Sequence, residues 1–310
     1  MIAHLIRTTC AAAIAASALV APAAAQDDWK SELPVFRVGL LGGENEADRL
    51  RRNECLVEQL SEALGVPVEL FPASDYAGVM QGLLAGQLDT ASLGASGYAG
   101  IYLQDPEAVE PVFVSLESDG SNGYYAMMYA KSDSGIEDLE DMQGKSLAFA
   151  DPNSTSGYLV PKAELEAAEI DIETYFSRTG FGGGHEQAVV AVLNDQYDAG
   201  VTWTSGQGEQ SQGFSRGNLH TMVNNGLLDM NDLSIIWTSN LIPNGPWVVR
   251  KEVPQEAKDI WTDWMANLAE TDYECYKDVS QGEGPGFERV DHSFFEGVVA
   301  MRERELQGSR

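Results

Sequence analysis

Short apolar runs alternate with amphipathic stretches along the first third of the chain. Residues 35–41, 66–71 and 88–93 are short segments with several apolar residues each, which predicts three buried strands. Between them, residues 48–64 and 76–85 carry apolar side chains at helical spacing. Strand–helix–strand alternation at this spacing indicates an α/β layer with a mostly parallel sheet.

The alternation restarts further along the chain and predicts a second lobe. The remaining expected strands lie at 108–116, 124–130, 146–150, 199–203 and 233–238, and the remaining expected helices at 162–169, 186–193, 258–268 and 294–304. We therefore expect two α/β lobes, the first made of 26–118 and 240–310, the second of 119–239. Two hinge crossings, near 117–124 and 238–243, would join them. Because ligands bind at the carboxyl ends of strands in open α/β sheets, we expect a cleft between the lobes.

Residues 1–25 have the pattern of a secretory signal peptide. Arg7 gives a basic start, residues 11–20 form a short apolar run, and small residues follow. The run is too short to span a membrane. We expect cleavage near Ala25 and Gln26, and a soluble, periplasmic mature chain.

The formal net charge of −29 narrows the choice of partners. Such an acidic chain is not expected to bind nucleic acid or an anionic membrane. Its overall field also repels anionic ligands. Any anion site must therefore act locally, through hydrogen-bond donors aimed at the ligand.

Two cysteines, Cys55 and Cys275, remain after cleavage. In an oxidising compartment they either form a disulfide or stay as two separate buried thiols, and spacing alone leaves both open. The chain has no Cys-x-x-Cys motif and no histidine-rich cluster. We expect no metal site and no cofactor.

The most informative segment is residues 151–161. It follows the predicted strand at 146–150 and precedes a predicted helix, and it holds Ser154, Thr155, Ser156 and Gly157 in succession. Free backbone N–H groups at a helix N-terminus, together with neighbouring hydroxyl groups, make an anion site. Gly157 would let the backbone approach a ligand closely. Helix capping alone accounts for one hydroxyl but not for three.

Motifs across the chain resemble the phosphonate-binding (phosphate, phosphite or phosphonate) proteins of bacterial ABC importers. The matching segments, in the family's order, are Asp75-Tyr76-Ala77-Gly78, residues 151–161, Gly184-His185-Glu186, Tyr197-Asp198-Ala199, Ile236-Trp237 and Leu241-Ile242-Pro243. The resemblance implies a type II periplasmic binding fold, whose two lobes close on a ligand. It also implies a transient ABC permease partner in the inner membrane and no enzymatic activity. We expect a monomer.

The resemblance assigns the phosphonate group to five side chains. Ser154, Thr155, Ser156 and His185 would hold its oxygens, and Tyr76 would add a hydroxyl. Charge-assisted bonds to such oxygens are roughly twice as strong as neutral ones. A protonated His185 would add charge, whereas a neutral ring offers one N–H. The competing interpretations are a structural His185 and a Tyr76 that merely packs at the interface.

The sequence departs from the family where an amine would bind. Ser205 and Gly245 stand where the aminophosphonate binder has carboxylates, and Leu93 stands where a tyrosine is expected. Either other acids bind the amine or the ligand is smaller. The candidate acids are Glu44, Asp119 and Glu209, although Asp119 also fits a simple turn residue. Ser205 and Trp203 are further pocket candidates, and Trp203 would otherwise fill the second core.

The leading hypothesis is a binding protein that captures a phosphonate for uptake, with 2-aminoethylphosphonate as the first candidate ligand. The alternative within the same class is phosphite or phosphate. An exported phosphoester hydrolase fits poorly, because the chain has four histidines, one of them in the signal segment, and no Gly-x-Ser-x-Gly motif around Ser154. A ligand sensor that docks on a receptor is not distinguished by sequence.

Overall fold

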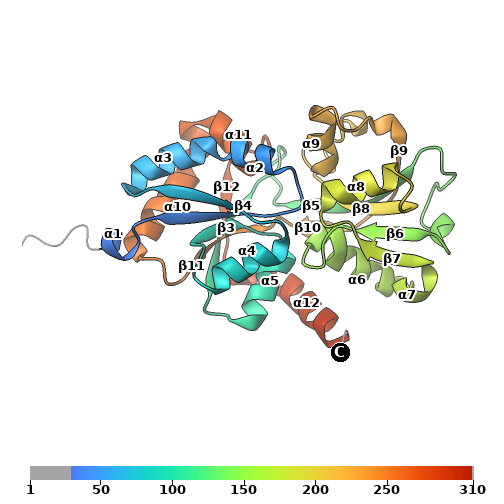
Figure 1. Cartoon of the computed structure of the whole chain (residues 1–310), viewed down its shortest axis with the longest axis horizontal. Coiled ribbons are helices and arrows are strands. Elements are labelled where there is room, and N and C mark those ends of the chain that lie inside the picture. Colours follow the sequence, from blue (N-terminus) through green and yellow to red (C-terminus); the bar gives the residue numbers. More distant parts are fainter. Residues whose placement is uncertain (1–28, 309–310) are drawn as a thin grey trace, which may run out of the picture.

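The computed structural model describes residues 29–308. The expected signal peptide and its cleavage site lie outside the described residues. Two α/β lobes stand side by side (Figure 1), as the alternation of strands and helices predicts.

The sheet of the first lobe has six strands. In spatial order these are β12 (Phe287–Arg289), β4 (Val109–Ser115), β11 (Pro246–Arg250), β3 (Thr90–Ser92), β1 (Phe36–Leu40) and β2 (Val68–Pro72). β1 pairs in parallel with β2 and β3, whereas β11, β4 and β12 pair antiparallel. The sheet is therefore mixed, with the antiparallel half formed by the strands on either side of the lobe crossings and by the C-terminal strand β12.

Helices cover both faces of this sheet. They are α1 (Trp29–Glu32), α2 (Glu46–Arg52), α3 (Glu54–Leu64), α4 (Tyr76–Leu84), α5 (Ala95–Gln104), α10 (Gln255–Thr271), α11 (Tyr273–Ser280) and α12 (Glu296–Gly308). The two faces have separate apolar cores, one around Trp261 and one around Tyr98. The helix expected at 48–64 is broken at Asn53, whose side-chain amide donates to the carbonyl of Arg49 over 2.8 Å.

The sheet of the second lobe also has six strands. Its strands are β10 (Ile242–Pro243), β5 (Gly123–Lys131), β8 (Ala199–Thr204), β6 (Ser146–Phe149) and β7 (Arg178–Phe181), and β9 (Leu233–Thr238) also pairs with β5. Its helices are α6 (Val160–Ala167), α7 (Ile172–Tyr175), α8 (His185–Leu193) and α9 (Asn218–Asn224). β6 pairs in parallel with β7 on one side and with β8 on the other, so their carboxyl ends share one edge.

The chain passes between the two sheets twice. It leaves the first sheet after Ser115 and enters the second at Gly123. It returns at residues 244–245, because Ile242 and Pro243 still pair with β5. The return therefore falls after the range 238–243 expected from the sequence. Which residues divide the lobes as moving units stays a prediction.

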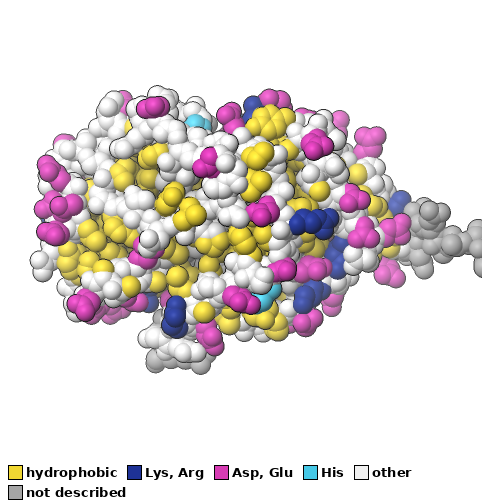
Figure 2. Space-filling view, turned by 180° about the vertical axis from the view of Figure 1, so that it is seen from behind, with side chains coloured by type: hydrophobic (Ala, Val, Ile, Leu, Met, Phe, Trp, Pro, Cys, Tyr) yellow, Lys and Arg dark blue, Asp and Glu magenta, His cyan; other side chains and the backbone are white. Residues whose placement is uncertain are grey.

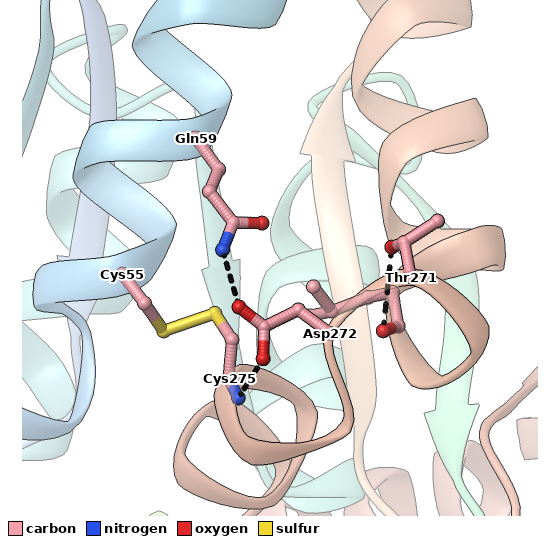
Figure 3. The surroundings of a disulfide bond; sticks show 6 residues. Cys55, Gln59, Thr271, Asp272 and Cys275 are labelled. Carbon is pink, nitrogen blue, oxygen red and sulfur yellow. Dashed lines mark hydrogen bonds between the residues drawn. A yellow bond between two sulfur atoms is a disulfide. The ribbon is translucent and has the colours of Figure 1, made fainter.

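The structure joins Cys55 on α3 to Cys275 on α11 by a disulfide, with 5.8 Å between the Cα atoms (Figure 3). Asp272, at the start of α11, accepts a hydrogen bond from Gln59 of α3 over 2.8 Å beside it. Both contacts lie within the first lobe. On the outside, acidic side chains are scattered over the face shown in Figure 2, with few Lys or Arg between them.

Candidate functional site

The hydroxyl-rich segment stands at the carboxyl end of β6, the middle strand of the parallel part of the second sheet. The chain there forms a single π-helical turn, Thr155–Leu159, that runs directly into α6. Ser154 caps this turn, and its Oγ accepts from the N–H of Gly157 over 3.0 Å. Capping therefore explains Ser154 in part, whereas Thr155 and Ser156 have no capping role in this turn. We call residues 151–157 the anion loop.

Packing within the second lobe leaves no room for a side chain at Gly157. A Cβ at this position would lie 2.5 Å from the Cβ of Ala150, 2.8 Å from Ser154 Oγ and 2.9 Å from His185 Cε1. The glycine thus makes room for the loop's own side chains and for the histidine ring. This packing brings Ser154 and His185 together.

His185 begins α8 and lies between two hydroxyl groups. Its Nε2 is 3.3 Å from Ser154 Oγ, and its Nδ1 is 3.3 Å from Thr202 Oγ1. Burial lowers the pKa of His185 to about 4, although the charge of Glu44 opposes this shift. The ring is therefore neutral near pH 7 and offers one N–H.

Two tyrosine hydroxyls lie beside the hydroxyl groups of the anion loop. Tyr76 begins α4 in the first lobe, and Tyr124 is the second residue of β5 in the second. Burial raises the pKa of both phenols. Hydrogen bonds of Tyr76 with Ser154, and of Tyr124 with Ser156 and Thr155, lower the pKa by less than burial raises it. Both hydroxyls stay protonated and can donate. Sequence reasoning missed Tyr124, because it lies about thirty positions before the loop and reaches it only through strand pairing.

The two lobes touch around this loop, so the arrangement is closed. Thr155 Oγ1 accepts a hydrogen bond from the backbone N–H of Ser96, on α5, over 2.9 Å. Gly43, after β1, meets Gly184, before α8, so closely that a Cβ on Gly184 would overlap the Gly43 backbone. Closure therefore brings loops at the carboxyl ends of β1 and β7 into direct contact.

A cavity of about 180 Å³ lies between the lobes beside the anion loop. Of the expected site residues, those on its wall are Glu44, Tyr76, Ser154, Thr155, Ser156, His185 and Trp203. Ser154, Thr155, Ser156 and His185 are each at most 4% exposed. Since a water needs roughly 10–15 Å³ by a comparable measure, the cavity has room for more than a bare oxyanion.

The charged side chains on the cavity wall within residues 29–308 are Glu44, Arg49 and Arg216. Glu44 accepts from Arg52 over 2.9 Å. Arg49 donates to the carbonyls of Leu40, Leu41 and Ala73 at distances of 2.8–3.2 Å. Burial lowers its pKa from the ordinary arginine value.

Arg216 connects the cavity wall to both lobe crossings. Its guanidinium pairs with buried Glu117 and lies over the ring of Trp203, 5.0 Å from the ring centre. Glu117, just after β4, also accepts from Asn244 of the return crossing over 3.0 Å. No local motif marks Arg216 or Arg49, and the sequence analysis did not select them.

Three expected pocket residues do not reach the cavity wall. Asp119 is fully exposed and accepts from the N–H of Ser121 over 2.9 Å, which lowers its pKa and fits the turn interpretation. Glu209 lies beyond the end of β8, ahead of a short 3₁₀ turn. Ser205 is buried but faces Ser215, 2.9 Å between hydroxyl oxygens.

The described residues contain no group of three or more His, Cys, Asp or Glu side chains placed to hold a metal ion. Within residues 29–308, no helix combines the length and apolar character that crossing a membrane requires.

Comparison with known proteins assigns the chain to a family. The family described as "ABC transporter, phosphonate, periplasmic substrate-binding protein" matches residues 38–293. The chain belongs to this family. Its members are substrate-binding components of ABC importers rather than enzymes, which agrees with the resemblance found in the sequence.

Individual relatives share the fold and differ in their named cargo. The chain is 32% identical over 264 residues to the phosphonates-binding periplasmic protein of Escherichia coli (strain K12), covering 82% of this chain and 71% of that protein. It is 28% identical over 275 residues to the phosphate-import protein PhnD of Mycolicibacterium smegmatis, covering 86% and 81%.

A crystal structure of a binding protein component of an ABC phosphonate transporter from Pseudomonas aeruginosa superposes with a TM-score of 0.75 at 26% identity, covering 87% of each chain. The two-lobe type II binding fold is thereby confirmed.

Proposed function

We propose that this chain captures 2-aminoethylphosphonate in the periplasm and delivers it to an ABC permease. The observation that carries the proposal is the anion loop on the wall of an inter-lobe cavity. There Ser154 lies beside His185 and Tyr76, and Thr155 and Ser156 lie beside the hydroxyl of Tyr124. Buried neutral donors can bind a phosphonate through direct hydrogen bonds, although the acidic surface of the protein provides no long-range attraction for an anion.

Glu44 supports the amine half of the proposal. Among the described residues, Glu44 is the carboxylate that lines the cavity, and Arg52 forms an ion pair with one of its oxygens. The second oxygen is left for an ammonium group. A buried ammonium requires such a partner, because an unpaired charge away from water is strongly unfavourable.

One observation favours the alternative ligand, phosphite or phosphate. Gly245 lies on the cavity wall, where a Cβ would overlap the carbonyl of Leu93. A carboxylate cannot enter at that position without a backbone shift. The pocket therefore lacks one of the acids expected for an amine, and the smaller oxyanion is the second candidate.

Calorimetry with 2-aminoethylphosphonate, methylphosphonate, phosphite and phosphate tests the proposal. We expect Ser154→Ala to weaken every ligand that binds. We expect Glu44→Gln to weaken 2-aminoethylphosphonate by about tenfold to hundredfold while methylphosphonate keeps its affinity. Glu209→Gln, outside the cavity, is the matched control. Tighter wild-type binding of phosphite or phosphate than of 2-aminoethylphosphonate would establish the alternative.

A further inference from the structure

The C-terminal helix α12 reaches from the first lobe to the anion loop of the second. It packs along α5 of the first lobe and contacts the π-helical turn after Ser154 (Figure 1). Met301, on this helix, lies against apolar residues of both lobes. α12 thus adds a packing contact between the lobes, besides the two chain crossings and the contacts at Thr155 and Gly184.

Arg302 makes the polar contact at this connection. Its Nη1 donates to the carbonyl of Pro152 over 3.0 Å, and its Nη2 donates to Asn153 Oδ1 over 2.9 Å. Nη1 also pairs with Glu305 over 3.1 Å on the same helix. Arg302 is 7% exposed. Its two contacts in the second lobe are the residues that immediately precede Ser154.

The contact lies on the outer side of the anion loop. Ser154, Thr155 and Ser156 line the cavity, whereas Pro152, Asn153 and Arg302 do not. A ligand would therefore hold the loop from within while Arg302 holds it from outside. The Asn153 backbone is fixed as well, because its N–H donates to Asp151 Oδ1 over 2.7 Å.

The burial of the Arg302 guanidinium suits a role in positioning the anion loop better than a large contribution to the free energy of unfolding. Burying a guanidinium removes its hydration, and Arg302 Nε is buried without a hydrogen-bond partner in the described chain. Arginine's planar fork nevertheless fixes two acceptors at once in a defined geometry, which a flexible ammonium does not. Here the fork aligns a backbone carbonyl and a side-chain amide.

We propose that Arg302 is a positioning residue for ligand capture. From the first lobe it fixes the anion loop of the second, and so couples the geometry of the phosphonate-binding hydroxyls to lobe closure. The inference rests on the proposed function for the identity of the ligand, although its effect on the loop does not. Because Arg302 acts on the anion end, its loss should affect every phosphonate equally, with or without an amine.

The test compares Arg302→Met, which keeps the apolar stem, with Arg302→Lys and with Arg304→Met. Arg304 lies on the same helix and is exposed, so it is the matched control. Calorimetry measures the affinity for 2-aminoethylphosphonate and methylphosphonate, and amide hydrogen exchange measures opening of residues 153–157. We expect Arg302→Met to weaken both ligands at least tenfold by the same factor and to speed exchange in the loop. Arg302→Lys should recover part of the loss, and Arg304→Met should match the wild type.

Wild-type affinity and loop exchange in Arg302→Met would overturn the inference. So would a loss of thermal stability with no change in the loop. Should Arg302→Met fail to fold, Asn153→Ala removes one acceptor from the other side, and it must shift affinity and exchange in the same direction. If the wild type binds no phosphonate or phosphate, the proposed function fails, and exchange in the ligand-free protein still decides the role of Arg302.

Discussion

The hydroxyl oxygen of Thr155, in the anion loop of the second lobe, accepts a hydrogen bond from the backbone N–H of Ser96 in the first lobe over 2.9 Å. Ser96 lies in the first turn of α5, where N–H groups have no partner within the helix. This bond uses one of the two lone pairs of the hydroxyl oxygen, so the O–H of Thr155 can still donate to a ligand. The Thr155 side chain thus links the binding of an anion to the closure of the two lobes.

Replacing Thr155 tests this double role. Thr155→Val keeps the shape and removes the hydroxyl, so it loses the inter-lobe bond and a donor to a charged ligand. Each such donor contributes about 1.5–3 kcal/mol, and we expect affinity to fall by at least about tenfold to hundredfold in calorimetry. Thr155→Ser keeps the hydroxyl and should stay near wild type. Equal affinities for all three proteins would remove Thr155 from the site.

The approach of Gly43 to Gly184 makes a steric test of closure possible. Gly184 has extended backbone, so Gly184→Ala introduces no left-handed strain, but its Cβ would overlap Gly43 when the lobes are closed. We expect weaker ligand binding by calorimetry. Small-angle scattering at saturating ligand should give a larger radius of gyration than for the wild type.

Gly297→Ala, on α12, is the matched control, because the added Cβ meets no atom within 4 Å beyond its own chain neighbours and helix backbone. A Gly184→Ala protein that closes and binds like the wild type would show that the two backbones move apart at little cost. In that case the contact is not a limit on closure.

The sequence was sufficient for the parts of the site that are local. A buried strand, consecutive hydroxyls and Gly157 define the anion loop within a dozen residues, and His185 follows a glycine turn. Tyr124 and Arg302 reach the same loop from distant segments, Arg302 from 150 positions away. Such contacts depend on strand pairing and on the course of α12, which local patterns do not encode.

The fold shows the same limit. Strand and helix alternation predicts both lobes, but α5 was missed because every residue from Ala95 to Ile101 is buried. A helix buried on all sides has no polar face and therefore no amphipathic period. The tight break at Asn53 was missed as well, since both flanking helices continue the same apolar stripe.

The neutral state of His185 predicts a pH dependence of stability. Its pKa is about 4 in the folded protein, below the ordinary value of about 6.5 for an exposed histidine. Between these values the unfolded chain binds more protons, so the free energy of unfolding falls as the pH drops through this window.

In ligand-free denaturant titrations from about pH 7 to about pH 4.5, the wild type should lose on the order of 2–3 kcal/mol more than His185→Gln. The comparison is between slopes, because the substitution also removes hydrogen bonds at every pH. Parallel pH profiles for the two proteins would mean that the ring is not buried in its neutral form.

The disulfide should stabilise the first lobe without taking part in ligand binding. Cys55 and Cys275 are 220 positions apart, so the crosslink restricts a long loop of the unfolded chain. We expect Cys55→Ser with Cys275→Ser to cost about 2–5 kcal/mol and to lower the melting temperature by roughly 5–15 °C. Affinity should stay within about threefold, because α11, whose end borders the cavity, is still held by the Gln59–Asp272 bond and by buried Tyr276.

A reductant should lower the melting temperature of the wild type to that of the variant and leave the variant unchanged. A melting temperature insensitive to both treatments would show that the two thiols do not pair in solution.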